Sequence, residues 1–156
     1  VGRGVPALQS HVESLGLGSQ VHLLEMMPDV SPGVAPELPP QRLVELYLAA
    51  DAFVLSSRLE GFSSALLEAM SSGLPIVATA APGIVDQVEH GREALLSPCG
   101  SSEMLAANLH TLFQDQKIAS RLGANAKEWS RDFSWENVTA NYTRLYERLI
   151  AEMDRA

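Results

Sequence analysis

The stretch from residue 51 to residue 79 constrains the fold more than any other part of the chain. An apolar, strand-like run at 52–56 leads through a glycine-containing turn into a helix-like run at 65–70. Gly73 stands where that helix is expected to end, and Pro75 precedes a second apolar run at 76–78. Two buried strands joined by a helix are typical of a parallel sheet, because parallel strands need a crossover connection.

The turn before the helix has the features of an anion site. Ser63 or Ser64 is expected to cap the helix, since a serine hydroxyl accepts an unpaired N–H of the first turn. The remaining free N–H groups point outward at the positive end of the helix dipole. This arrangement favours a bound phosphate or carboxylate.

Two glutamates flank this turn. Glu60 precedes it, and Glu68 lies about one turn inside the helix, among apolar residues. An ionised glutamate only accepts hydrogen bonds, so Glu68 suits the two hydroxyls of a sugar diol. There is a simpler reading for each residue: a glutamate within a helix usually faces solvent, and one before a helix often only complements the dipole.

The whole string resembles the donor-binding signature of retaining glycosyltransferases of group 1 (family 4), which have the GT-B fold. That signature reads E-G-F-[GS]-x-x-x-L-E-A-M, followed by A-x-G-x-P-[IV]-[VI]-A-[TS]. Here it is matched by Glu60-Gly61-Phe62-Ser63, by Glu68-Ala69-Met70 and by Ser72-Gly73-Leu74-Pro75-Ile76-Val77-Ala78-Thr79. The F-S-W-E string at 133–136 also matches the family, whereas Val85 and Asp86 stand where it usually has Pro and Glu.

The resemblance implies a site for a nucleotide-diphospho-sugar. Glu68 would bind the ribose hydroxyls, and Glu60 would contact and orient the donor sugar as the catalytic residue. Backbone N–H groups of Gly61, Phe62, Ser63 and Ser64 would hold the diphosphate and sugar hydroxyls. The family's reaction retains the anomeric configuration and needs neither a metal nor a cofactor.

The implied activity is transfer of a hexosyl-type sugar to a glycan or lipid-linked acceptor, as in polysaccharide biosynthesis. In the family, an Arg and a Lys upstream of the matched region stabilise the leaving phosphate, and a separate N-terminal domain binds the acceptor. We expect both to lie outside these 156 residues, which alone should not catalyse transfer. The alternative is a non-catalytic nucleotide-sugar-binding module or a truncated remnant. Epimerases that share the fold are a lesser rival.

Composition narrows the remaining choices. The net charge of −8 and the pI near 4.9 argue against a nucleic-acid or anionic-membrane partner. The four histidines have no metal-ligand spacing, and a single cysteine excludes an internal disulfide. No apolar run is long enough to cross a membrane, and no signal peptide is evident. We expect a cytoplasmic location, with peripheral membrane attachment through the N-terminal domain as an alternative.

Alternating strands and helices predict an α/β fold with a Rossmann-like open parallel sheet, the C-terminal half of a GT-B fold without its first strand–helix unit. Ligands bind such sheets at the carboxyl ends of the strands. Residues 1–133 should form the nucleotide-sugar-binding domain, with a proline-rich loop inserted at 25–40, and 134–156 a C-terminal helix. The expected helices are 7–17, 41–50, 84–89, 103–113 and 118–131, with further strands at 21–24 and 94–96.

Overall fold

The computed structural model describes residues 5–24 and 40–153. The chain divides into two units, 1–43 and 44–156. In the first, helix α1 spans Val5–Ser14, in agreement with the predicted helix. The strand predicted at 21–24 is wrong: these residues form no regular secondary structure, and no strand within the described residues pairs with them. Residues 1–4 and, except for Pro40, the predicted loop at 25–40 lie outside the described residues.

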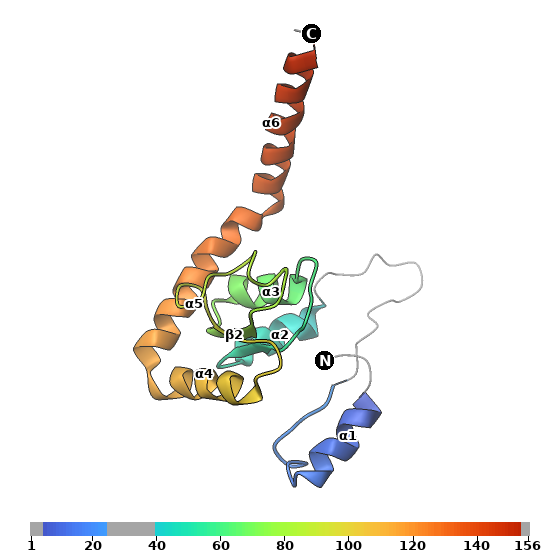
Figure 1. The fold of residues 1–156 in the computed structure, drawn as a ribbon, viewed down its shortest axis with the longest axis vertical. Helices are drawn as coiled ribbons and strands as arrows, with labels where there is room; N and C mark the ends of the chain where they lie inside the picture. Colours follow the sequence, from blue (N-terminus) through green and yellow to red (C-terminus); the bar gives the residue numbers. More distant parts are fainter. Residues whose placement is uncertain (1–4, 25–39, 154–156) are drawn as a thin grey trace. The chain divides into compact units, whose positions relative to one another are not determined.

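The second unit contains the predicted parallel α/β sheet. Strands β1 (Phe53–Leu55), β2 (Ile76–Thr79) and β3 (Ala94–Ser97) lie in the order β1-β2-β3 and are all parallel. The helices of the chain that accompany them are α2 (Gln41–Ala49), α3 (Ser64–Ser72), α4 (Ser102–Gln114), α5 (Gln116–Ser130), the 3₁₀ helix η1 (Arg131–Phe133) and α6 (Trp135–Met153) (Figure 1).

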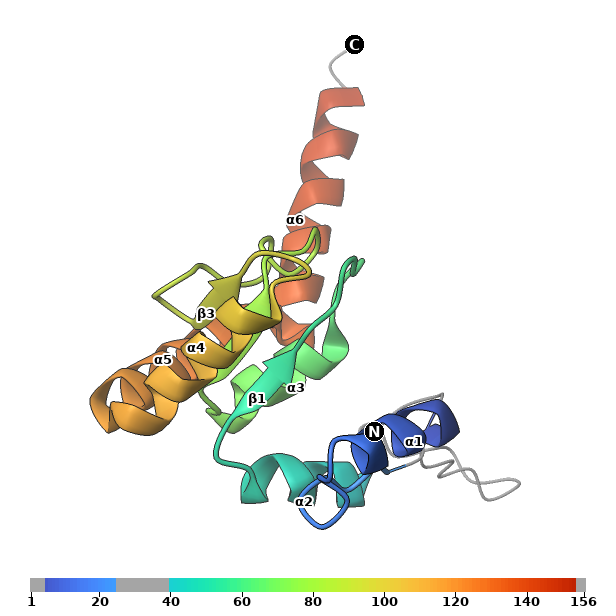
Figure 2. The same ribbon diagram turned by 60° about the horizontal axis from the view of Figure 1, so that its bottom comes forward.

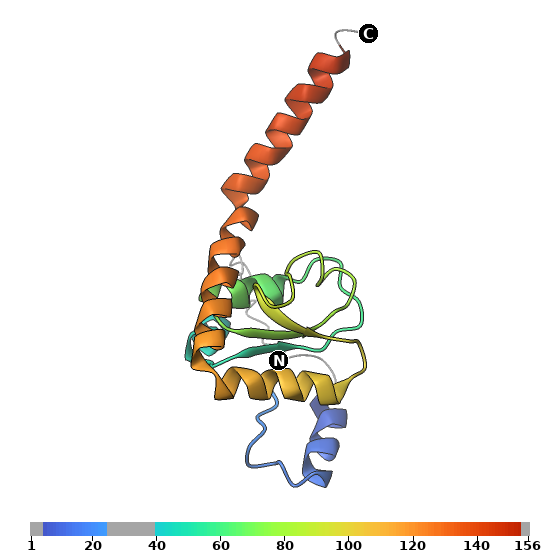
Figure 3. The same cartoon turned by 60° about the vertical axis from the view of Figure 1, so that its left-hand side comes forward.

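Alternation along β2 divides the core between the two faces of the sheet. Ile76 and Ala78 belong to one apolar cluster, which includes Leu66 and Met70 of α3. Val77 belongs to the other, which includes Leu112 of α4 and Leu122 of α5. Figure 3 shows α3 on one face of the sheet and α4 on the other. Because all four residues of β2 are buried, this strand holds both layers together.

Helix α3 has both of the end signals expected from the sequence. Ser63 is its N-cap, and the Ser63 hydroxyl accepts the Leu66 N–H at 3.4 Å. At the other end Gly73 adopts a left-handed conformation with φ of 79°, and its N–H donates to the Met70 carbonyl at 2.9 Å. A residue without Cβ is favoured there. The cap at Ser63 fixes where the chain passes from the turn into α3, and Gly73 fixes where it leaves α3 toward β2.

Some expectations need correction. Residues 82–87 form hydrogen-bonded turns in place of the predicted helix at 84–89, because Gly83 has φ of 82° and the N–H groups of Ile84 and Val85 share the Ala81 carbonyl. The predicted buried strand β1 lies at the edge of the sheet that the described residues form, and Val54 on it is 42% exposed. On α2, Tyr47 is buried, whereas Leu46 is exposed.

Helix α6 extends away from the sheet of its unit (Figures 2 and 3). Apolar side chains recur every three or four residues along it, but none of its described residues is buried. No helix in the described part of the chain combines the length and the apolar character that crossing a membrane requires.

A close glycine contact joins α3 to α5. A Cβ at Gly123 would lie 2.3 Å from the Gly73 carbonyl oxygen, a backbone atom that cannot move aside without displacing the end of α3. The contact therefore lets α5 approach α3 closely.

We predict that Gly123→Ala lowers the free energy of unfolding by about 1–3 kcal/mol, as overpacking does. At an uncrowded position within a helix the same change would stabilise by about 1 kcal/mol, so the sign of the effect identifies the contact. Urea unfolding of the variant and of the exposed control Ser120→Ala on the same helix measures this. A stabilised Gly123→Ala variant would contradict the close packing.

Candidate functional site

The loops that follow β1 and β2 lie side by side at the carboxyl ends of these strands (Figures 1 and 3). The Glu60 N–H donates to the Pro82 carbonyl at 3.0 Å. A Cβ on Gly83 would lie 2.2 Å from the Glu60 carbonyl oxygen. Only glycine permits this approach, so the second loop fixes the backbone that carries Glu60.

A buried glutamine holds the peptide groups of Ser63. Gln87 Oε1 accepts the Ser63 N–H at 2.8 Å, and Gln87 Nε2 donates to the Ser63 carbonyl at 3.2 Å. The Gln87 backbone carbonyl in turn accepts the indole N–H of Trp129 at 2.8 Å. Sequence reasoning missed Gln87, although one signal was available: it is the single uncharged polar side chain in the run from Ile84 to Val88.

The free donors of the turn follow from these bonds. Ser63, one of the four predicted backbone donors, already gives its N–H to Gln87. Among the described residues, no partner occupies the N–H groups of Gly61, Phe62 or Ser64, and all three residues are exposed. The predicted anion site therefore rests on these three groups, at the N-terminus of α3.

Glu60 is half-buried and held at one oxygen. The Ser57 hydroxyl donates to Glu60 Oε1 at 2.5 Å. Ser57 is itself fixed, because its carbonyl accepts the hydroxyl of Thr79, a buried residue at the end of β2. The carboxylate is thus oriented from the strand ends, and Oε2 has no partner among the described residues.

Glu68 is also held at one oxygen. The Tyr47 hydroxyl lies 3.0 Å from Glu68 Oε2, to which it donates, and 3.3 Å from the Ala65 carbonyl. Tyr47 is only 9% exposed. Burial, with the negative charge of Glu68 and the hydrogen bond to it, raises the pKa of the Tyr47 phenol well above its ordinary value. The hydroxyl therefore stays a donor to Glu68, a role that the sequence did not reveal.

Phe62 links the turn to the end of α5. Its ring is 53% exposed, yet it lies 5.5 Å from the ring of Phe133, which in turn lies 5.6 Å from the ring of Trp129 in an edge-on contact. Aromatic pairs at such distances stabilise beyond their buried area. The side chain of Phe62 is thus directed to η1, while its N–H stays free.

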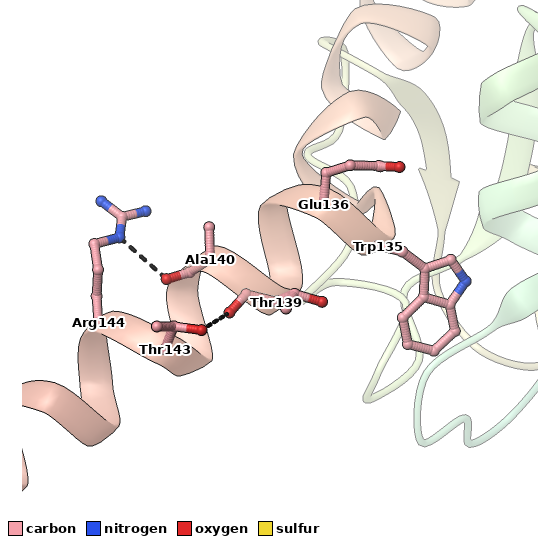
Figure 4. Close-up of a pocket in the computed structure, with 6 residues that line it drawn as sticks. All are labelled: Trp135, Glu136, Thr139, Ala140, Thr143 and Arg144. Carbon is pink, nitrogen blue, oxygen red and sulfur yellow. Dashed lines mark hydrogen bonds between the residues drawn. The ribbon is translucent and has the colours of Figure 1, made fainter.

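Two other kinds of site, a metal site and a surface hollow, are not supported by the described residues. Within the described residues, no group of three or more His, Cys, Asp or Glu side chains is arranged to hold a metal ion. A shallow hollow lies on α6 and is lined by six residues (Figure 4): Trp135, Glu136, Thr139, Ala140, Thr143 and Arg144. All of them come from one helix, so this hollow has no facing wall and we do not regard it as the site.

The chain belongs to the family of glycosyl transferases group 1, which residues 5–129 match. It is 36% identical over 113 residues to D-inositol 3-phosphate glycosyltransferase of Corynebacterium glutamicum (strain R), an alignment covering 72% of this chain and 27% of that protein. The α/β fold is that of the GT-B structures in this family. This confirms the resemblance seen in the sequence and shows that the chain is a transferase-family domain.

Two solved structures support the same conclusion. Sucrose-phosphate synthase from Thermosynechococcus elongatus has a TM-score of 0.76 and 26% identity, covering 94% of this chain and 34% of that one. Anabaena Alr3699/HepE, solved in complex with UDP-glucose, has a TM-score of 0.73 and 28% identity, covering 94% and 36%. The chain spans about a third or less of the length of these proteins.

The Tyr47–Glu68 hydrogen bond can be tested by removing one oxygen. We predict that Tyr47→Phe lowers the free energy of unfolding near neutral pH by about 0.5–1.5 kcal/mol, the usual worth of a hydrogen bond. Because the folded-state pKa is raised, the Tyr47 contribution is complete below the unfolded-state pKa of about 10 and declines as pH rises above it.

The measurement is urea unfolding of both proteins between pH 7 and pH 11. The difference between wild type and Tyr47→Phe should shrink above about pH 10. Tyr146→Phe, an exposed site on α6, is the matched control. A difference that grows with pH would contradict the raised pKa.

Proposed function

We propose that this chain is the nucleotide-sugar donor-binding part of a retaining, metal-independent glycosyltransferase. The observation that carries the proposal is the pair of oriented carboxylates, Glu60 and Glu68, on either side of a turn with free N–H groups. The carboxylate oxygens, which accept hydrogen bonds from hydroxyl groups, therefore lie near N–H groups that can donate to an anion. A nucleoside diphosphate joined to a sugar has both kinds of group.

The roles of the individual residues follow from their chemistry. Gly61, Phe62 and Ser64 have free N–H groups that suit the diphosphate oxygens, helped by the α3 dipole. Tyr47 holds Glu68 Oε2, and no group in the described part of the chain occupies Glu68 Oε1, which would accept the ribose hydroxyls. Glu60 has Oε2 free for the donor sugar and would act as the catalytic residue that orients it. Ser63 acts as helix cap and as part of the turn.

Support for the proposal comes from the family and from one neighbour's ligand. Glycosyl transferases group 1 include proteins named for sugar transfer, and Alr3699/HepE was solved with UDP-glucose. Transfer of a hexosyl sugar to a glycan or lipid-linked acceptor by the whole protein is part of the proposal, as are the acceptor-binding domain and the absence of a cofactor. A non-catalytic nucleotide-sugar-binding module remains the alternative.

The first test is thermal unfolding with UDP, GDP and ADP and their sugar conjugates. A ligand at about 100 times its dissociation constant stabilises by about 2.7 kcal/mol, which corresponds to about 5–10 °C in Tm at this size. We expect a shift for one base, lost in Glu68→Gln. The control Glu147→Gln, exposed on α6, should keep it. Absence of a shift with every nucleotide would contradict the proposed site.

The second test separates the two carboxylates. Glu60→Gln removes charge near the donor sugar but leaves the ribose site intact. We predict that the affinity for the nucleotide-sugar falls about tenfold, as for loss of one hydrogen bond to a charged group, while that for the free nucleoside diphosphate changes less than about twofold. Isothermal titration measures both affinities. Equal losses for both ligands would argue against a role at the sugar.

A further inference from the structure

Both polar atoms of the Gln87 side chain are hydrogen-bonded to Ser63, a residue of the proposed donor site. Its amide oxygen accepts from Ser63 and its amide nitrogen donates to the same residue, so one side chain holds both peptide groups of the helix cap. Gln87 is 2% exposed. A buried amide of this kind fixes the orientation of the backbone it binds.

The orientation of the Ser63 peptide groups determines where the neighbouring N–H groups point. The Ser63 N–H belongs to the peptide that follows Phe62, and the Ser63 carbonyl belongs to the peptide that carries the Ser64 N–H. Since peptide units are planar, fixing the carbonyl also fixes the Ser64 N–H on the opposite side of its plane. The Ser63 carbonyl also accepts the Leu67 N–H of α3 at 3.1 Å, so the free Ser64 N–H takes its direction from Gln87 together with the first turn of the helix.

Gln87 is itself anchored from another element. Its backbone carbonyl accepts from Trp129 on α5, and the Trp129 ring contacts Phe133, whose ring contacts Phe62. A closed set of contacts thus runs from the turn through Gln87 and Trp129 and back to the turn. Both peptides that flank Ser63 are thus hydrogen-bonded to the side chain of Gln87.

We infer that Gln87 is a positioning residue for diphosphate binding: it holds the Ser63 peptide groups so that the Ser64 N–H faces the ligand. This inference rests on the proposed function. Gln87 does not touch the ligand. Its effect is on the diphosphate, whereas the nucleoside, bound at Glu68, is recognised independently of it.

The test compares two ligands on three proteins. The Kd values of UDP, GDP and ADP, each beside its nucleoside, are measured by ligand-observed NMR with wild type, Gln87→Met and the control Gln114→Met, an exposed residue that ends α4. We expect Gln87→Met to weaken the diphosphate that binds by about tenfold, because hydrogen bonds to a charged group depend on alignment. Its nucleoside should stay within about twofold, and Gln114→Met should match wild type.

The outcomes separate this inference from the proposed function. Equal weakening of nucleoside and diphosphate would mean that Gln87 only supports the fold, and no weakening would mean that it has no role; either result overturns the inference alone. If wild type binds none of the three diphosphates, the proposed function is contradicted and the inference is overturned with it.

Gln87→Glu keeps the test decisive if the methionine variant does not fold. A neutral carboxylic acid has one acceptor and one donor, as the amide has, whereas the ionised form has no donor for the Ser63 carbonyl. Diphosphate affinity relative to wild type at the same pH should therefore fall as the pH is raised from 5 to 8. A ratio that does not change with pH would overturn the inference.

Discussion

The site depends on the contact between the Gly83 turn and the Glu60 peptide. At φ of 82° and with no Cβ, Gly83 packs where a side chain would collide with the Glu60 carbonyl. This contact and the hydrogen bond from the Glu60 N–H to the Pro82 carbonyl hold the loop after β1 against the loop after β2. Gln87 lies on the same loop as Gly83 and makes two hydrogen bonds to Ser63, the cap of α3.

A second close glycine contact, between Gly123 of α5 and Gly73 at the end of α3, also supports the site. Gly123 lets α5 run close to the end of α3, where it meets the Gly73 carbonyl. Trp129 follows further along α5 and donates its indole N–H to the Gln87 carbonyl. The close packing of α5 on α3 therefore helps to place the Trp129 indole within hydrogen-bond distance of the Gln87 carbonyl.

The features that the sequence predicted well are those with local causes. The limits of α3 follow from Ser63 as cap and Gly73 as left-handed end, and the parallel pairing of β1 and β2 follows from the helix between them. The long-range partners could not be predicted. Gln87 lies 24 residues from Ser63 and Tyr47 lies 21 residues from Glu68, and no local pattern records such pairs.

Two of the wrong predictions, the helix at 84–89 and the buried position of Val54, also failed because they depend on contacts between distant parts of the chain. The helix expected at 84–89 fits the apolar spacing, but Gly83 and the packing of its turn on Glu60 favour another backbone. Val54 was expected inside a continuous apolar strand, yet β1 lies at the edge of the sheet. The ligand roles of Glu60, Glu68 and the turn residues stay predictions, since they concern groups outside the chain.

The hydroxyl partners of the two glutamates explain why this arrangement would select a particular ligand chemistry. Ser57 and Tyr47 each donate one hydrogen bond to a single oxygen of a carboxylate, which fixes its orientation without neutralising its charge. The oxygen left over only accepts, so it attracts a hydroxyl and repels a phosphate. The free N–H groups of the turn between them only donate, so they have the opposite preference. A ligand that satisfies both must carry hydroxyl groups on either side of an anionic centre, and a diphosphate placed between two sugar rings is the simplest molecule that does.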